Sequence, residues 1–542
     1  MLFIQPTWFT LFFFRRFFLP LLIWLPLTVS LAQSPAALPP TVRQATLQLP
    51  AFVQDSLDNY VRRGMTAWRI PGMAVVIVKD GQVVLAKGYG LQAMGRSQPV
   101  TADTRFPIAS NTKLFTGVAV ATLDEQKRLS LDEPVIHYLP DLKLYNADWT
   151  KLVSLRDLLS HRVGTRTFQG NFLYWNSTLS RQQVVSSFEH LVPSNPFRQT
   201  YGYCNTGYVA AGEVIAKVTG QSWDTYIQQL LLTPLAMTST TTSMTGLNEE
   251  TNIARGHTSC CGDPGQLQSL PFDVLDNIGA SASIVSTAND LGKWLMMQLD
   301  SGRRGNQQIV PWGALAKTRV GNTILASKHA PTSPFPTQLA MYGLGTGLID
   351  YNGSLLHNHL GVAIGFKSHV AFVPELRLGI AILVNQDEQY FGEALQYDLL
   401  DAFFGLPYAN RNQYFSKIQA TAQQRRLTEQ KAFIDRVAKR SPLPSPIQTY
   451  CGQFRNALYG TLQVAVDPAD TSSHRLRLSF EHHPNLSAWL DYMDDDTFRL
   501  SFSNPRYGIT PAKVTRKGGQ PSTIDIRISD FLDPTPYLFT RQ

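Results

Sequence analysis

The first folded segment of the chain changes from a helical pattern of apolar residues to the pattern of strands. Residues 55–69 carry apolar side chains three or four positions apart, which predicts a helix that stops at Ile70-Pro71-Gly72. Two runs rich in β-branched residues follow, at 73–78 and 83–89. Asp80-Gly81 between them is a strong turn signal, so we predict a β-hairpin.

The centre of the chain has mostly helical patterns, and strand patterns return after it. Helices are predicted at 113–128, 205–219, 223–231 and 288–300. Strands are predicted at 344–350, 354–359, 366–373 and 377–384. Because strands both open and close this region, we predict an α+β domain over residues 55–408. Its N- and C-terminal segments would share one antiparallel sheet, flanked by a helical subdomain.

The last part of the chain has a different pattern, which predicts a second domain. Residues 409–440 are rich in Gln, Arg and Lys, and Pro442, Pro444 and Pro446 follow, so we predict a helical connector and linker over 409–448. Short alternating runs then recur at 460–466, 476–480, 488–492, 497–502 and 524–528. Strands at this spacing predict a small all-β barrel, folded separately, over residues 449–542.

The chain begins with a segment that has the features of a secretory signal. Arg15 and Arg16 precede the apolar stretch 17–29, and Ser30-Leu31-Ala32 then supplies small residues at the −3 and −1 positions of a cleavage site. We therefore expect residues 1–32 to be removed and residues 33–54 to form a leader. The mature protein would be secreted to the periplasm or outside the cell. An uncleaved N-terminal membrane anchor is the alternative, since a Phe-rich segment precedes the arginines.

The composition of the chain excludes several classes of protein. Of the 542 residues, 44% are hydrophobic and 16% are charged, which suits a large core and not a disordered chain. The formal net charge is +8, but no run of five Lys or Arg occurs, so we expect no nucleic-acid partner. Beyond the N-terminus no apolar run approaches the ~20 residues of a spanning helix. The four cysteines lack zinc-ligand spacing, and we expect no metal and no organic cofactor.

Ser110 and Lys113 form the first candidate catalytic pair. They lie three positions apart at the start of a predicted helix, so both side chains share one helical face. There an amine can accept the hydroxyl proton, and the positive helix N-terminus favours developing negative charge. Taken alone, the pair is more typical of an N-capping serine followed by a solvated lysine.

Two further motifs favour the catalytic interpretation of this pair over the N-capping one. Tyr203 and Asn205 lie two positions apart, just before a predicted helix, and can aim a phenol and an amide at one point for proton relay and carbonyl binding. His359 and Gly361 lie near the end of a predicted strand, where a glycine permits close backbone approach and a backbone N–H can stabilise an oxyanion. His357 and His359 could instead be ordinary strand residues, or half of a metal site.

The order Ser110-x-x-Lys113, Tyr203-x-Asn205, His359-x-Gly361 resembles the serine β-lactamase family. Its members include class C β-lactamases, D-alanyl-D-alanine carboxypeptidases, D-aminopeptidases and esterases. Segments around 70–78, 106–110, 155–164 and 282–291 are similar to the family's sequences as well. The resemblance covers about residues 55–405 and implies a β-lactamase/transpeptidase-like fold. The tail from Tyr450 resembles the lipocalin-like barrel that follows this domain in some members.

The resemblance implies a role for each motif residue. Ser110 would attack a carbonyl and form an acyl-enzyme. Lys113 and Tyr203 would share the role of general base, and which of them carries the charge stays open. Asn205 would orient Lys113 and the substrate amide. His359 would orient Tyr203 or bind an acidic end of the substrate.

The resemblance also places the oxyanion donors at the backbone N–H groups of Ser110 and Val362, beside Gly361. Class C enzymes carry Lys where this chain has His359, so esters and D-amino peptides are favoured over β-lactams as substrates. Lys367 is a candidate for supplying the missing charge. Aromatic pocket walls are expected at Phe168, Tyr174, Trp175 and Phe366.

The predicted function is therefore a secreted serine hydrolase that cleaves amide or ester bonds through a Ser110 acyl-enzyme. The substrate would be a small molecule or a peptide, such as cell-wall peptide, and the oligomeric state stays open. A class C-like β-lactamase proper is the alternative within this class. A non-catalytic penicillin-binding receptor is the alternative from another class, and it would be favoured by loss of the motif Ser, Lys or Tyr, all of which are present.

Overall fold

A computed structural model describes residues 48–248, 252–260, 266–326, 334–470, 474–529 and 532–542. The predicted signal segment and most of the predicted leader lie outside the described residues, as does Cys261. Among the described cysteines, Cys204 and Cys451 are free thiols.

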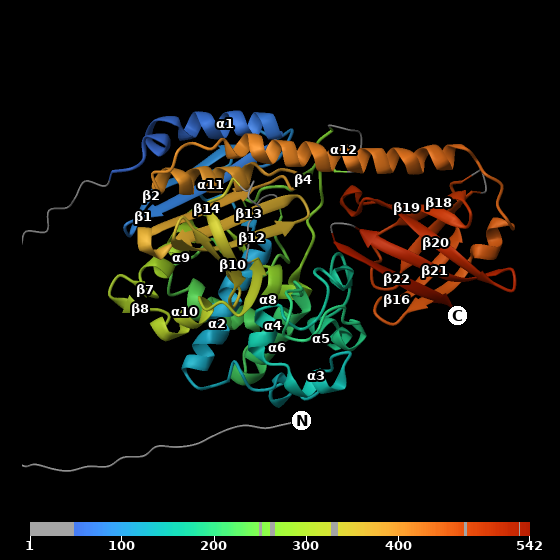
Figure 1. The fold of residues 1–542 in the computed structure, drawn as a ribbon, viewed down its shortest axis with the longest axis horizontal. Coiled ribbons are helices and arrows are strands. Elements are labelled where there is room, and N and C mark those ends of the chain that lie inside the picture. Colours follow the sequence, from blue (N-terminus) through green and yellow to red (C-terminus); the bar gives the residue numbers. More distant parts are fainter. Residues whose placement is uncertain (1–47, 249–251, 261–265, 327–333, 471–473, 530–531) are drawn as a thin grey trace, which may run out of the picture. The chain divides into compact units, whose positions relative to one another are not determined.

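An eight-stranded antiparallel sheet forms the centre of the larger domain (Figure 1). β1 pairs with β14, so the N- and C-terminal segments share one sheet, as predicted. The fold class predicted from the sequence, α+β followed by a small barrel, is confirmed. In sheet order the strands are β2 (Gln82–Gly90), β1 (Gly72–Lys79), β14 (Leu378–Val384), β13 (Phe366–Val373), β12 (Ser354–Ala363), β11 (Gly347–Tyr351), β10 (Thr337–Tyr342) and β9 (Thr323–Ala326).

The predicted hairpin is present between β1 and β2. Asp80 and Gly81 both have positive φ, 52° and 78°, which is the conformation that a tight primed turn requires. From Met73 to Val78 every residue of β1 is buried, because helices cover both faces of the sheet. That burial explains why the strand is a continuous apolar run rather than an alternating one.

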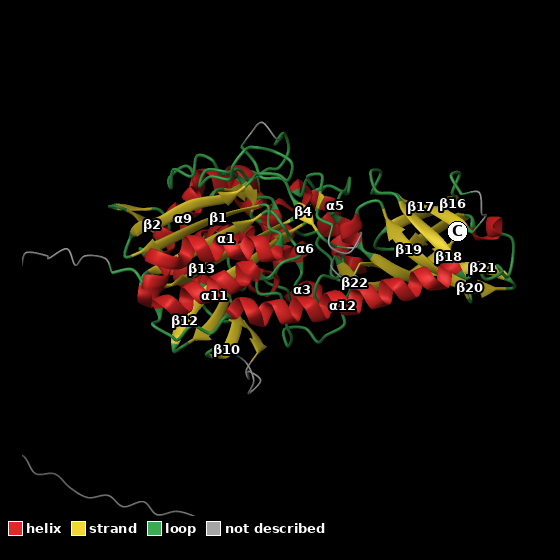
Figure 2. Ribbon diagram, turned by 90° about the horizontal axis from the view of Figure 1, so that it is seen from above, coloured by secondary structure: helices red, strands yellow, loops and turns green. Residues whose placement is uncertain are grey.

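Helices lie on both sides of this sheet (Figures 1 and 2). α1 (Leu57–Trp68) and α11 (Phe391–Phe403) share one hydrophobic cluster with one face of β1. α9 (Ala288–Leu299) contacts β1 and β14 and belongs to the other cluster, together with the helical subdomain. The other α-helices that the structure describes in this domain are α2 (Thr112–Glu125), α3 (Ala147–Leu152), α4 (Leu155–Leu159), α5 (Arg181–Ser186), α6 (Asn205–Thr219), α7 (Trp223–Ile227), α8 (Gly279–Ala282) and α10 (Trp312–Thr318).

The last eight strands close into an antiparallel barrel. Alternate residues of its strands, such as Leu476, Leu478 and Phe480 of β17, are buried in the main hydrophobic cluster, so packed side chains fill the interior. The strands are β15 (Gly452–Asn456), β16 (Gly460–Val466), β17 (Arg475–Phe480), β18 (Ala488–Asp494), β19 (Thr497–Phe502), β20 (Ile509–Lys517), β21 (Gln520–Ser529) and β22 (Asp533–Arg541).

The predicted connector is one 28-residue helix, α12 (Arg411–Ala438), which contacts α11 near its start and β18 further along (Figure 2). It is polar almost all round, with exposed ion pairs such as Arg425–Glu429 one turn apart. Arg436 of α12 also pairs with Asp494 of β18. The helix therefore follows both domains rather than crossing open solvent as a flexible tether.

The barrel is packed against the larger domain through buried contacts. The His483 ring stacks on Phe172 with centroids 3.9 Å apart, and its Nε2 lies 2.7 Å from the Phe172 carbonyl oxygen. Arg506 lies between Asp387 and Glu388, with its Nε 3.1 Å from the Asp387 carboxylate. The barrel residues thus share a core with the larger domain, which a sequence pattern of self-contained strands does not reveal.

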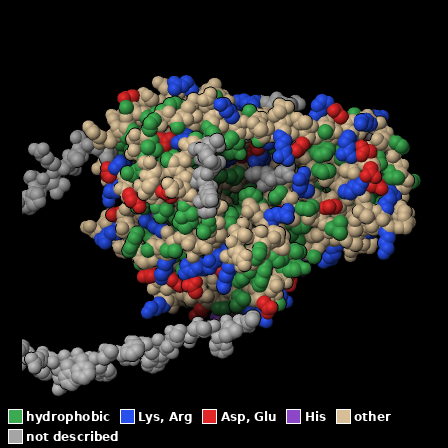
Figure 3. Space-filling model, viewed as in Figure 1, with side chains coloured by type: hydrophobic (Ala, Val, Ile, Leu, Met, Phe, Trp, Pro, Cys, Tyr) green, Lys and Arg blue, Asp and Glu red, His purple; other side chains and the backbone are tan. Residues whose placement is uncertain are grey.

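The face drawn in Figure 3 shows no single basic region among its described residues. On the face drawn in Figure 3, Lys and Arg side chains alternate with Asp and Glu. Across the part of the chain that the structure describes, no helix combines the length and the apolar content needed to cross a bilayer.

Candidate active site

Ser110 lies in a one-turn 3₁₀ helix (Ala109–Asn111) that leads directly into α2. The preceding residue, Ala109, has φ of 47°, a left-handed conformation that a non-glycine residue rarely adopts. The turn is held in place by the sheet, because the Ser368 hydroxyl donates to the Ile108 carbonyl at 2.7 Å. Asn111 Nδ2 donates to the same Ser368 hydroxyl at 2.8 Å. The backbone around Ser110 is therefore fixed from both sides.

Gly361 of β12 explains why this strand can lie against the Ser110 turn. A Cβ atom at this position would lie 2.0 Å from the Ile108 carbonyl oxygen and 2.3 Å from Ser368 Oγ. The sequence predicts that Gly361 permits close backbone approach, and the structure identifies the Ile108 backbone as the group that approaches. β12 loses its partner β11 after the Gly347–Asn358 pair, so the stretch with Gly361 and Val362 faces the cavity with one edge unpaired.

Lys113 is fully buried and points back to Ser110. Its Nζ lies 3.2 Å from Ser110 Oγ, and it donates to Asn205 Oδ1 at 2.6 Å and to the Ser281 carbonyl at 3.1 Å. Burial lowers the pKa of Lys113 well below its usual value. A neutral amine has two hydrogens and one lone pair, which matches two carbonyl acceptors and one hydroxyl donor. Lys113 is thus arranged to accept the Ser110 proton.

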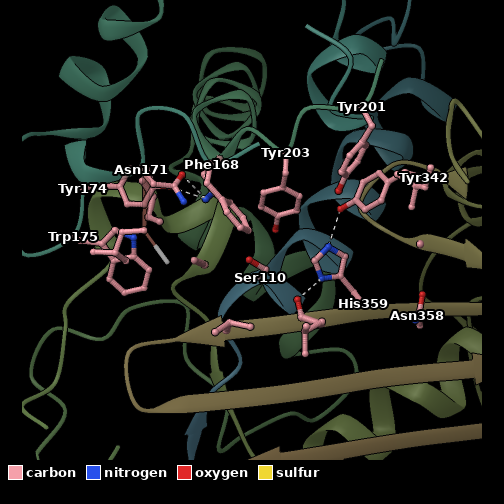
Figure 4. A pocket seen from close by; sticks show the side chains of 18 of the residues that line it. Ser110, Phe168, Asn171, Tyr174, Trp175, Tyr201, Tyr203, Tyr342, Asn358 and His359 are labelled. Atoms are coloured by element: carbon pink, nitrogen blue, oxygen red, sulfur yellow. Dashed lines mark hydrogen bonds between the residues drawn. The ribbon is translucent and has the colours of Figure 1, made fainter. Parts of the chain in front are cut away.

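Tyr203 lies on the other side of Ser110, and its hydroxyl points toward the serine in Figure 4. Burial raises the pKa of Tyr203 above its usual value, and interaction with the Ser110 hydroxyl opposes that rise. Lys113 Nζ lies 4.7 Å from the centre of the Tyr203 ring. Because the two pKa values move in opposite directions, the favoured resting pair is a neutral amine and a neutral phenol.

Asn205, the first residue of α6, is held by hydrogen bonds on both sides of its amide. Its Oδ1 accepts from Lys113 Nζ and from the Ser281 hydroxyl at 2.7 Å. Its Nδ2 donates to Asn171 Oδ1 at 3.2 Å and to the Tyr174 hydroxyl at 2.6 Å. The structure therefore supports the expected orientation of Lys113 by Asn205, while both ends of the amide are already engaged by protein groups.

His359 has a different set of partners from those expected. Its Nδ1 lies 2.9 Å from the Leu360 carbonyl oxygen, and its Nε2 lies 2.8 Å from the Tyr342 hydroxyl. The Nδ1–H tautomer donates to the carbonyl and leaves Nε2 to accept from Tyr342. Its ring is 6.4 Å from that of Tyr203, centre to centre, and the polar contacts that orient it run to Tyr342 and Leu360 (Figure 4).

Charge is absent from His359 at neutral pH. Burial lowers its pKa to about 3. Lys367, the candidate for supplying a cation instead, donates to the Gln389 carbonyl and to Glu393 Oε1 at 3.1 Å. Lys367 is therefore already paired, and it does not line the cavity at Ser110.

Ser110 opens into a cavity of about 350 Å³. Three of the four expected aromatic walls, Phe168, Tyr174 and Trp175, line it. Phe366 does not, and packs beside Phe272 instead. The barrel also reaches this cavity, since Leu532 is one of its lining residues.

Sequence reasoning missed several residues that shape this site. Tyr342, Asn171 and Ser281 each bond a motif residue, yet each lies in a segment with no spacing signal of its own. His161 falls in a segment noted for its resemblance, with no role attached. Its Nδ1 accepts the Cys204 backbone N–H at 3.1 Å, and its ring lies 4.2 Å from that of Tyr203. His161 therefore holds Tyr203 in place from behind.

Barrel residues secure the loop that carries the aromatic wall. Asp533 accepts the Gly170 backbone N–H at 2.8 Å, and the Tyr537 hydroxyl lies 3.2 Å from the same nitrogen. This loop supplies Phe168, Asn171 and Trp175 to the cavity. The barrel thus contributes to the site by fixing one of its walls.

The chemistry available at Ser110 is acyl transfer by a serine hydroxyl, with a neutral amine to take its proton, which is the chemistry of a serine hydrolase. Comparison with known proteins agrees. The family model described as Beta-lactamase matches residues 57–403, and the chain belongs to the beta-lactamase family. That result confirms the family resemblance derived from the motifs.

Individual relatives match different shares of the chain. The chain is 25% identical over 494 residues to the unguisins hydrolase ungD of Aspergillus violaceofuscus, covering 85% of this chain and 87% of the relative. It is 25% identical over 348 residues to Protein flp of Staphylococcus aureus, covering 64% and 65%. The octameric penicillin-binding protein homologue from Pyrococcus abyssi has a similar fold, with a TM-score of 0.56, 22% identity, and 89% and 99% coverage.

Proposed function

We propose that this protein is a secreted hydrolase that cleaves ester or amide bonds of small molecules or peptides through a Ser110 acyl-enzyme. The observation that carries the proposal is the desolvated Lys113, with its Nζ 3.2 Å from Ser110 Oγ and no carboxylate among its hydrogen-bond partners. A lysine in that setting is neutral and can act as a base. Family members named hydrolases support hydrolysis as the reaction.

The proposed reaction begins when Lys113 Nζ takes the Ser110 proton as Oγ attacks the substrate carbonyl. The backbone N–H groups of Ser110 and Val362 are proposed to stabilise the oxyanion. Tyr203 then gives its proton to the leaving group and is reprotonated through Lys113, so the bond to the leaving group breaks and the acyl-enzyme remains. Water attacks the ester with Lys113 again as base, which releases the acid and restores Ser110.

Secretion is part of the proposal, and the signal-like sequence of residues 1–32 supports it. The alternative of an uncleaved N-terminal anchor is distinguished by N-terminal sequencing of the protein from its native compartment. A first residue at Gln33 supports cleavage after Ala32. Retention of Met1, with the protein in the membrane fraction, supports the anchor.

We expect esters to be better substrates than β-lactams. His359 stands where class C enzymes carry a lysine, and it is neutral and already bonded on both nitrogens. Loss of a charge-assisted contact to a substrate carboxylate costs about 1.5–3 kcal/mol, or roughly ten- to a hundred-fold. A panel of 4-nitrophenyl esters, D-amino peptides and a cephalosporin, read as kcat/KM, measures this directly.

Two substitutions at the same position control the panel. His359→Lys should raise kcat/KM for the cephalosporin relative to the best ester or peptide. His359→Gln, which keeps hydrogen bonding without adding charge, should not. A wild-type kcat/KM for the cephalosporin equal to that for the best ester or peptide would instead favour the β-lactamase alternative. A ligand bound without any turnover would favour the receptor alternative.

A further inference from the structure

The cavity at Ser110 has walls on two opposite sides. Figure 4 shows Ser110 at the centre, with Tyr174 and Trp175 to one side and Tyr201 and Tyr342 to the other. All of these side chains line the same cavity. A substrate whose scissile carbonyl lies at Ser110 Oγ therefore meets protein on both sides of the bond that breaks.

The walls are mostly apolar, and the polar groups among them are uncharged. Further apolar side chains line the same cavity: Ile278, Leu325, Ile349, Leu360 and Leu532. The amides of Asn171 and Asn358 and the tyrosine hydroxyls supply neutral hydrogen-bonding groups. Among the described lining residues none has a charged side chain at neutral pH, because His359 is neutral.

A carboxylate placed in this cavity would lose its hydration without gaining a cation. Lys113 lies beneath Ser110, where its hydrogens are donated to Asn205 and Ser281, and its lone pair is needed for the reaction. Lys367 is paired with Glu393. Burial of an unpaired charge is strongly unfavourable, whereas apolar groups gain free energy on entering such a site.

We infer that the site is built for an uncharged, largely apolar substrate that continues on both sides of the scissile bond, so that an internal ester or amide is cleaved rather than one beside a free carboxylate. This inference rests on the proposed function and adds the class of substrate. It separates the protein from a carboxypeptidase, which must accommodate the terminal carboxylate of its substrate next to the bond. The volume of about 350 Å³ suits groups of modest size on each side.

Three matched chromogenic esters test the inference. The reference is 4-nitrophenyl 4-phenylbutanoate, which is neutral and apolar on both sides of the bond. The second, 4-nitrophenyl 4-(4-carboxyphenyl)butanoate, carries a carboxylate on the acyl side. The third, 3-carboxy-4-nitrophenyl 4-phenylbutanoate, carries one on the leaving-group side. We expect kcat/KM for each acid to be lower by roughly ten- to a hundred-fold, after division by its rate of spontaneous hydrolysis.

A charged wall should reverse part of this preference. Leu360 lines the cavity and is 40% exposed, so a lysine at that position can keep its ammonium group hydrated near the substrate. Leu360→Lys should bring kcat/KM for at least one of the two acidic esters closer to that for the neutral ester. Leu538→Lys is the matched control, at a leucine of β22 that is 53% exposed and outside the cavity. It should leave the ratio of kcat/KM between the neutral and the acidic esters unchanged.

Failure of this inference is distinguishable from failure of the proposed function. Labelling of Ser110 by a fluorophosphonate is measured on the same preparation. If Ser110 is labelled and either acid is hydrolysed as well as the neutral ester, the inferred substrate class is wrong while the serine hydrolase stands. If Ser110 is not labelled and the esters are not hydrolysed, the inferred substrate class and the proposed serine hydrolase function are both wrong.

Discussion

Replacing Lys113 by alanine should lower kcat by roughly 10²–10⁴, the contribution of a positioned acid–base group. The Nζ atom is the one basic nitrogen bonded to Ser110 among the described residues, and it is held by Asn205 and Ser281. Without it, the Ser110 proton has no acceptor of suitable pKa. Steady-state hydrolysis of a 4-nitrophenyl ester by the variant measures the loss.

Tyr203→Phe should cause a loss of the same order, about 10²–10⁴ in kcat, because it removes the hydroxyl that faces Ser110 and keeps the ring. The two residues are expected to act as one unit, so the double variant should lose far less than the product of the single losses. Losses that multiply would show that Lys113 and Tyr203 act in separate steps. Lys151→Ala, at an exposed lysine paired with Asp148, is the control and should leave kcat unchanged.

The pH dependence distinguishes the two groups. Burial lowers the pKa of Lys113, and the neutral form is the active base, so kcat/KM should fall as pH falls through that lowered pKa. The pKa of Tyr203 is raised, so its phenol stays protonated across the neutral range. This fall in kcat/KM at acidic pH should persist in Tyr203→Phe and should be absent from the residual activity of Lys113→Ala. An unchanged fall in Lys113→Ala would contradict the assignment of the base.

Arg506→Met should lower the free energy of unfolding by about 3–5 kcal/mol, the usual cost of leaving a buried charge without its partner. Arg506 comes from the barrel, and its partners Asp387 and Glu388 follow β14 of the main sheet. Glu388 also accepts from Arg426 of α12 at 3.0 Å, so three parts of the fold meet there. Urea unfolding at neutral pH, followed by circular dichroism, gives the loss.

A matched surface pair and a pH series complete this experiment. Arg425→Met breaks an ion pair whose side chains are 81% and 49% exposed, so it should cost below about 1 kcal/mol. Arg506 and Arg426 hold the pKa of Glu388 at about 2, below its ordinary 4.5. Stabilisation from a lowered carboxyl pKa is complete above the ordinary value and disappears as pH falls through the lowered one.

The difference between wild type and Arg506→Met should therefore shrink between about pH 4.5 and pH 2. Burial raises the pKa of Asp387, so its protonation on acidification weakens the same pairing and shifts the difference in the same direction. A difference that stays constant over this range would show that Arg506 stabilises the junction through packing rather than charge.

Much of the fold was accessible from the sequence because its elements have clean periodicity. The predicted helix at 205–219 and the predicted strands at 366–373 and 460–466 have the same bounds in the structure. β20 and β22 were missed for physical reasons. In β20, apolar and polar residues alternate only weakly. β22 contains Pro534 and Pro536, and proline normally argues against a strand within a sheet. Closure of the barrel supplies their pairing, and closure is not a local property.

The candidate site was predictable in its motifs and not in its surroundings. Ser110, Lys113, Tyr203 and Asn205 come together as the motif order suggests, within hydrogen-bonding or ring contact of one another. The partner of His359 was not predictable, since Tyr342 lies on β10, a strand without a recognised pattern. The contribution of the barrel to the cavity was also hidden, because the sequence shows where strands form and not which domain they pack against.

The central claim is that Ser110 forms a covalent acyl-enzyme. A fluorophosphonate added to the purified protein should increase its mass by one adduct, and peptide mapping should locate the adduct on Ser110. Ser110→Ala should retain its fold and acquire no label. Label on another serine of the wild type, or ester hydrolysis undiminished in Ser110→Ala, would contradict the account.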